Sequence, residues 1–124
     1  MRQDATRWAT TAAAAEIAAT GLILLLSPVL FGRLIFGAEL SGPGQALGRL
    51  TGIALLGFAL TSWPAPSAQS VGRAILAYNL LATLYLGYLG LVGASVGVLL
   101  WPAVALHLLL TVSLTAERVA ARRA

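Results

Sequence analysis

The sequence predicts an all-α protein that crosses a membrane four times, and two observations carry this prediction. Of the 124 residues, 59% are hydrophobic and only 10% are charged, whereas ordinary soluble domains carry about 25% charged residues. A soluble fold of this size has too much surface for its volume to hide so many apolar side chains. Four apolar segments also approach the roughly 20 residues that a helix needs to cross the hydrocarbon core. We therefore expect one domain, residues 1–124, folded as an integral membrane four-helix bundle.

The first two helices are expected at about residues 8–30 and 47–63. A cleaved signal peptide is the alternative interpretation of the first one. Glu16 interrupts what would be its apolar core, however, and SPVLFG contains no A-x-A cleavage site. The second helix ends at TSWPAP, because proline removes a hydrogen-bond donor and clashes with the preceding turn. The long connection between the two helices contains the turn sequence SGPG and a short stretch that could lie at the membrane interface.

The third and fourth helices are expected at about residues 72–92 and 96–116. Only the three residues GAS, 93–95, separate them, so they should form a tight antiparallel hairpin. Their combined length is far too great for a single crossing.

Arginine placement predicts the orientation, because cytoplasmic loops carry an excess of basic residues. All eight basic residues are arginines, and four crossings put six of them on the side of the termini. Both termini should therefore be cytoplasmic, in the inner membrane of a bacterium, since a lysine-free, alanine-rich chain is typical of GC-rich bacterial genomes. The net charge of +4 does not indicate a nucleic-acid partner, because the arginines are scattered at the ends of apolar runs.

Three polar residues inside the apolar segments are expected to meet. At ~1.5 Å per residue, Glu16 lies ~12 Å from Trp8 and His107 lies ~15 Å from Glu117 along their helices. Asn79 lies ~9 Å beyond Arg73 by the same rise. These reference residues mark the cytoplasmic interface, so the sequence predicts that Glu16, Asn79 and His107 share one height.

This polar cluster has two interpretations, and Tyr78 lies at the same height. Hydrogen bonds among such side chains hold membrane bundles together. Alternatively, ionisable groups away from water form a proton or ligand site, which would use Glu16, Asn79, His107 and Tyr78.

Glycine spacing predicts close helix packing. Gly44, Gly48 and Gly52 recur every fourth residue, and Gly93 and Gly97 form a second pair. Small residues let helix backbones approach, either within the bundle or across a dimer.

Arg49 lies within the first glycine run, near the outer surface. Its long side chain is expected to extend to the interface. Binding of an anionic lipid headgroup is the alternative role for this arginine.

Known catalytic and cofactor patterns are missing from the sequence. There is no cysteine and a single histidine, so thiolate metal sites and bis-histidine haem ligation within one chain are excluded. No phosphate-binding loop, nucleophile elbow or dinucleotide fingerprint occurs. We therefore predict no catalytic residue, no metal ligand and no bound cofactor.

The stretch SPVLFGRLIFGAELSGPGQALGRLTGIALLGFAL, 27–60, resembles the first two helices of DoxX-like small four-helix bacterial membrane proteins. The shared features are a proline-ended first helix, a glycine-bearing loop and an Arg-x-x-Gly opening of the second helix, here Arg49 to Gly52. This resemblance implies architecture more than activity, since most such proteins have none assigned.

A second stretch, AAAAEIAATGLILL, 12–25, is similar to the first helix of small multidrug-resistance transporters. In that family a glutamate carries the exchanged proton or cation, and Glu16 occupies its position. The longer loop after the first helix and the six-to-two arginine bias depart from the pattern of that family.

Three functional hypotheses follow from the sequence. The first is a non-enzymatic accessory or scaffold protein in the lipid bilayer, as a homodimer or beside a larger membrane complex. The second is a proton-coupled small-molecule transporter or lipophilic-ligand-binding protein that uses Glu16 with His107 and Asn79. The third is a redox accessory that binds a quinone or haem.

Overall fold

The computed structural model describes residues 2–62, 69–93 and 96–123, and these fold into helices joined by short non-helical segments. Four of these helices have between 21 and 25 residues, and no strand occurs in the described ranges. The all-α prediction is confirmed. The long helices are α1 (Arg2–Leu26), α3 (Gly42–Ser62), α4 (Gln69–Val92) and α5 (Leu100–Arg123).

Two short elements, α2 (Pro28–Phe31) and η1 (Gly32–Phe36), reverse the chain after α1. Ser27 leaves helical geometry, with φ −145° and ψ 73°, and Pro28 opens the next helix. Proline suits this first helical position because the amide hydrogen it lacks would have no intrahelical partner there. The first predicted helix, 8–30, is therefore interrupted at Ser27, where the chain turns.

The element η1 is a single π-helical turn that ends at Gly37 in the left-handed conformation, with φ 70°. Its carbonyl groups reach another part of the chain. Leu34 O accepts a hydrogen bond from Leu99 N at 2.8 Å, and Ile35 O accepts one from Gly97 N at 2.9 Å. These bonds hold residues 97–99 in a non-helical turn, and α5 begins at Leu100 rather than at the expected residue 96.

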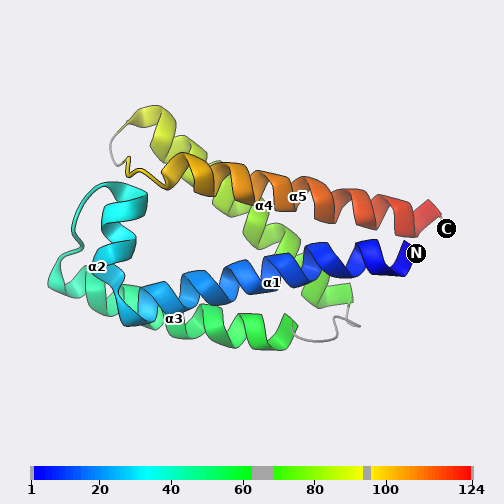
Figure 1. The fold of residues 1–124 in the computed structure, drawn as a ribbon, viewed down its shortest axis with the longest axis horizontal. Helices are drawn as coiled ribbons and strands as arrows, with labels where there is room; N and C mark the ends of the chain where they lie inside the picture. The colour runs from blue at the N-terminus through cyan, green and yellow to red at the C-terminus, as the bar shows by residue number, and fades with distance from the viewer. Residues whose placement is uncertain (1, 63–68, 94–95, 124) are drawn as a thin grey trace.

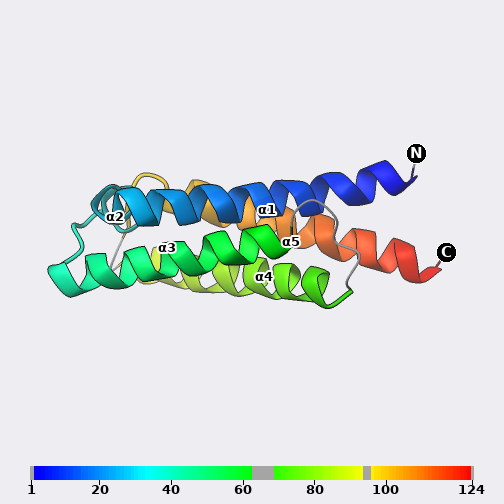
Figure 2. The ribbon, with the colours of Figure 1, turned by 90° about the horizontal axis from the view of Figure 1, so that it is seen from below.

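The long helices form two antiparallel pairs. α1 packs mainly against α3, and α4 packs mainly against α5, while α1 and α5 provide most of the contact between the pairs. Figures 1 and 2 show both termini at one end of the molecule, with α2 at the opposite end. Gly21 and Gly52 lie where the backbones of α1 and α3 are in close contact, since a Cβ at Gly52 would be 2.6 Å from Gly21 O.

A buried apolar cluster lies between the pairs in the half of the molecule that carries the termini. It is built from residues of α1, α4 and α5 that are at most 4% exposed: Ala9, Ala13, Ile75, Leu110 and Leu114. Phe58 of α3 packs against its edge. All four long helices therefore meet in this half.

Three helices are long and apolar enough to cross a membrane, and they contain residues Trp8–Leu26, Gly72–Val92 and Leu100–Arg123. In the apolar segments of these helices only 11% to 39% of the residues are buried inside the protein. Large exposed apolar patches of this kind mark surfaces that lie against lipid or another protein. A multi-pass membrane protein is therefore indicated. The expected helix at 47–63 forms within α3, but α3, which contains Gln45 and Arg49, is not among these three candidates. Trp63 lies outside the described residues.

Candidate functional site

The structure brings Glu16, Asn79, His107 and Tyr78 together in one cluster, which we call the polar centre. α1 supplies Glu16, α4 supplies Tyr78 and Asn79, and α5 supplies His107. The expected proximity of the first three is thus observed. A regular helix rises by about 1.5 Å per residue, so the position of each residue in its helix sets its depth. Glu16, Asn79 and His107 reach the same depth on three different helices.

His107 and Asn79 form the best-defined contact of the polar centre. Nδ1 of His107 lies 2.9 Å from Oδ1 of Asn79, and the two residues are 6% and 0% exposed. The Asn79 amide donates from Nδ2 to Ile75 O at 3.0 Å, which leaves its oxygen as the acceptor toward the histidine. The proton of a neutral His107 therefore sits on Nδ1, and the lone pair of Nε2 points elsewhere.

The free side of His107 faces the carboxylate of Glu16. Nε2 of His107 lies 3.6 Å from Oε1 of Glu16, which is an ion-pair distance but too long for a hydrogen bond. Thr20, one turn farther along α1, donates its hydroxyl to the same carboxylate oxygen at 2.9 Å. Oε1 of Glu16 therefore accepts a hydrogen bond from Thr20 of α1 and lies 3.6 Å from His107 of α5.

The second carboxylate oxygen of Glu16, Oε2, is buried and has no hydrogen-bond partner in the described structure. The Glu16 side chain is only 10% exposed. Buried polar groups are almost always hydrogen-bonded, and an exception calls for an explanation in terms of strain, function or a bound species. Because Oε2 has no hydrogen-bond partner, the polar centre is not a fully hydrogen-bonded structural network.

Aromatic rings close one side of the polar centre. Tyr78 meets the His107 ring edge to face, with centroids 5.7 Å apart and planes at 77°. Phe58 of α3 meets Tyr78 in the same manner at 6.2 Å. Phe58 was not predicted from the sequence, although counting back from residue 63, the predicted end of the second helix, would have placed it near this height.

Arg49 is not part of the polar centre. It is exposed on α3, in the half of the molecule away from the termini, and the structure does not bring it near Glu16 or His107. Tyr85 and Tyr88 also point outward and are 61% and 59% exposed.

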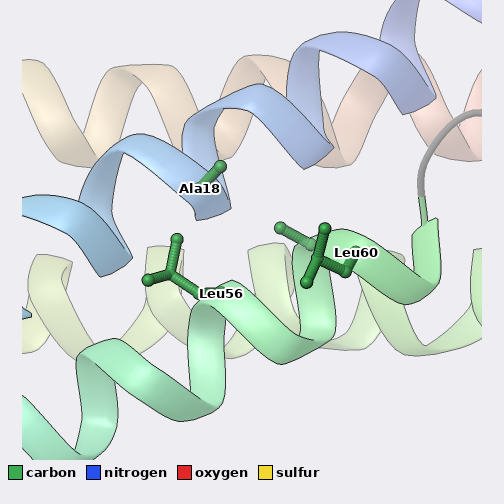
Figure 3. A pocket seen from close by; sticks show the side chains of 4 residues that line it. Ala18, Leu56 and Leu60 are labelled. Atoms are coloured by element: carbon green, nitrogen blue, oxygen red, sulfur yellow. The ribbon is translucent and has the colours of Figure 1, made fainter.

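A small apolar pocket of about 110 Å³ lies between α1 and α3. Figure 3 shows Ala18, Leu56 and Leu60 around it, and Ala59 completes the lining. No polar side chain contributes to this lining, so the pocket offers space for a few methyl groups and no means of orienting a polar ligand.

Metal chemistry has no support in the described ranges, because no three His, Cys, Asp or Glu side chains there lie close enough to hold an ion. The polar centre has one imidazole and one carboxylate. An imidazole and a carboxylate at this distance can share a proton or accept hydrogen bonds.

No protein-family model, curated protein or solved structure matches the chain.

Proposed function

We propose that the chain is a non-enzymatic multi-pass protein of the bacterial inner membrane that crosses it four times and binds a proton at the polar centre. The termini lie together at one end of the molecule (Figure 1). A chain that crosses with α1, α4 and α5 and keeps both ends on one side needs one further crossing. α3 supplies it, because it runs beside α1 in the opposite direction.

The arginine distribution supports cytoplasmic termini. Six arginines lie toward the terminal end and two toward the other, and Arg33 of the latter two is paired with Glu39. Basic residues accumulate on the cytoplasmic side of membrane proteins. Arg49, exposed on α3, then reaches the headgroups of the opposite leaflet.

The single observation that carries the proton site is the orientation of His107 toward Glu16. Asn79 holds the Nδ1 proton, so two acceptors, Nε2 and Oε1, face each other across 3.6 Å. With no proton between them, a carboxylate and a lone pair would repel each other away from water. One added proton removes this repulsion, either as a carboxylic acid beside a neutral imidazole or as an ion pair. The polar centre therefore binds one proton.

Infrared spectroscopy of the protein in lipid nanodiscs tests the proton site. A carboxylic acid carbonyl band, or the matching imidazolium signal, is expected near neutral pH and should disappear in Glu16→Gln. Glu39→Gln is the matched control, because Glu39 is exposed and paired with Arg33 outside the polar centre. An unchanged spectrum in Glu16→Gln would show that Glu16 binds no proton in this range.

The biological role that fits best is an accessory component of a larger membrane complex or a homodimer, in which the polar centre joins three helices. A proton-coupled transporter is the second candidate, and the unpartnered Oε2 of Glu16 favours it. A transporter needs a group that exchanges partners during its cycle, whereas a purely structural network is more stable when every member is satisfied.

Glu16→Gln and His107→Ala distinguish these two roles. For the accessory role, we expect both variants to change the melting temperature while pH gradients across proteoliposomes decay as they do with the wild type. Loss of substrate-driven proton movement in both variants, with the fold retained by circular dichroism, would instead establish the transporter.

A further inference from the structure

Thr20 uses its hydroxyl group differently from three threonines of α4 and α5. Thr83, Thr111 and Thr115 each donate to the backbone carbonyl four residues earlier, at 2.8, 2.7 and 2.7 Å, which is a usual bond for a threonine within a helix. The corresponding carbonyl for Thr20 belongs to Glu16. The Thr20 hydroxyl instead donates to the side chain of that residue, with Oγ1 2.9 Å from Oε1. Thr20 therefore contacts the ionisable group of the polar centre directly.

The carboxyl group of Glu16 has little other support. Its side chain is 10% exposed, and Oε2 has no hydrogen-bond partner in the described ranges. Nε2 of His107 lies 3.6 Å from Oε1, which is beyond hydrogen-bonding distance. A buried carboxylate is costly when it lacks hydrogen bonds. The bond from Thr20 therefore bears directly on the balance between the ionised and the protonated forms of Glu16.

We propose that Glu16 carries the proton of the polar centre as a carboxylic acid and that Thr20 sets how tightly this proton is held. The inference rests on the proton site proposed above and names the group that takes the proton. One proton joins the carboxylate, so the charge of the Glu16–His107 pair changes from −1 to 0, and its departure restores the carboxylate. Thr20 does not bind the proton itself; it is a positioning residue that acts through Glu16.

The other form of the pair, a carboxylate beside an imidazolium, is disfavoured by Oε2. A buried ion pair is stable only when further hydrogen bonds satisfy its remaining lone pairs. Oε2 would keep negative charge without such a partner, whereas the acid leaves neither residue charged. His107 then stays neutral, with its proton on Nδ1 toward Asn79 and the lone pair of Nε2 toward Glu16.

The hydroxyl of Thr20 stabilises the carboxylate more than the acid, because a hydrogen bond to an ionised group is stronger than one to a neutral group. A bond that favours the charged form weakens proton binding, so Thr20 opposes proton uptake and aids proton release. Uptake does not strand the hydroxyl. The backbone carbonyl of Glu16 is the kind of acceptor that Thr83 uses, and a carbonyl oxygen has two lone pairs.

The described groups that face Glu16 from other helices are His107 of α5, Tyr78 of α4 and Phe58 of α3. Asn79 and Thr20 carry no charge. The other charged residues of the four long helices lie at least five residues along their helix from these positions, which is a rise of ~7 Å or more. Proton binding at Glu16 is therefore governed by His107 and by the hydrogen bond from Thr20.

Infrared titration of Thr20→Val in lipid nanodiscs tests the proposal. The variant should bind the proton about tenfold more tightly, the effect of losing one hydrogen bond to a charged group. The pH at which half of the Glu16 acid band is present should therefore rise by about one unit. Thr20→Ser keeps the hydroxyl and should restore the wild-type value.

Thr83→Val is the matched control. It removes a similarly part-buried hydroxyl one turn from Asn79, but that hydroxyl donates to a backbone carbonyl and not to Glu16. The half-point should stay at the wild-type value. Thr20→Ala is the second variant should Thr20→Val lose its helical circular dichroism, and the same rise is expected. An unchanged or lowered half-point without the Thr20 hydroxyl, or an equal rise in Thr83→Val, would overturn the proposal.

Nitrogen NMR separates this inference from the proton site itself, because the chain has a single histidine and labelled histidine reports His107 alone. The His107 signals should keep the neutral form, protonated on Nδ1, while the Glu16 acid band appears. An imidazolium signal in place of the acid band would refute the proposal and leave the proton site standing. Absence of both signals throughout the titration would refute both.

Discussion

Replacing Gly52 by alanine is expected to lower the free energy of unfolding by about 1–3 kcal/mol, the usual cost of overpacking a close contact. A Cβ at this position would lie 2.6 Å from Gly21 O and 2.7 Å from Leu25 N. Both are backbone atoms, so no rotation of a side chain can relieve the clash, and α1 must move away from α3. Thermal unfolding in mild detergent, followed by circular dichroism, measures the loss.

Gly57→Ala is the matched control on the same helix. A Cβ at Gly57 would have no heavy atom within 4 Å, so the substitution should gain about 0.5–1 kcal/mol from the better helix propensity of alanine. The two variants are therefore expected to move the melting temperature in opposite directions. A loss of stability in Gly57→Ala equal to that in Gly52→Ala would contradict the described packing of α3 against α1.

The second large effect is expected for Asn79→Leu, which removes the acceptor of His107 without changing side-chain size greatly. Nδ1 of His107 would remain buried without the partner that now lies at 2.9 Å. Leaving a buried donor unsatisfied costs about 1–3 kcal/mol, more than the ~0.6 kcal/mol typical of an interhelical hydrogen bond in membranes. We expect the melting temperature to fall accordingly, and nitrogen NMR of His107 to show loss of the fixed tautomer.

The double variant Asn79→Leu/His107→Leu checks the cause of this loss. Removing both partners leaves no unsatisfied donor at this position. The double variant should therefore lose less free energy of unfolding than the two single variants lose together, by about 0.5–3 kcal/mol, as for contacting residues in general. Strict additivity would show that the two side chains do not interact in the membrane.

The polar centre was predictable from the sequence because its geometry depends on a regular quantity. Within an apolar helix the rise per residue is constant, so counting from interfacial residues places Glu16, Asn79 and His107 at one depth. The orientation of these three side chains toward one another could not be predicted from the sequence. The side of His107 that faces Asn79 depends on helix rotation, which is set by the packing of the apolar cluster around Ile75 and Leu110.

Glycine spacing predicted close contacts but not all of the partners. In α3, Gly48 and Gly52 pack against α1 near Leu24 and Gly21, as expected for a contact within the bundle. Gly97, expected to pair with Gly93 between two helices, instead lies against the carbonyl of Leu34 in η1. Sequence spacing could not reveal this contact, because it depends on a π-helical turn that leaves the carbonyls of Leu34 and Ile35 free.

The pairing of α1 with α3 and of α4 with α5 has a consequence for biogenesis. The first hairpin is complete as soon as α3 has been synthesised, whereas His107 is carried by α5, which is synthesised after both α3 and α4. During that interval Glu16 enters the lipid with Thr20 as its one hydrogen-bond donor among the described residues of α1. Until α5 has been synthesised, Glu16 therefore lacks the His107 side chain that lies 3.6 Å from it in the folded protein, and the first hairpin must form without this ion-pair partner.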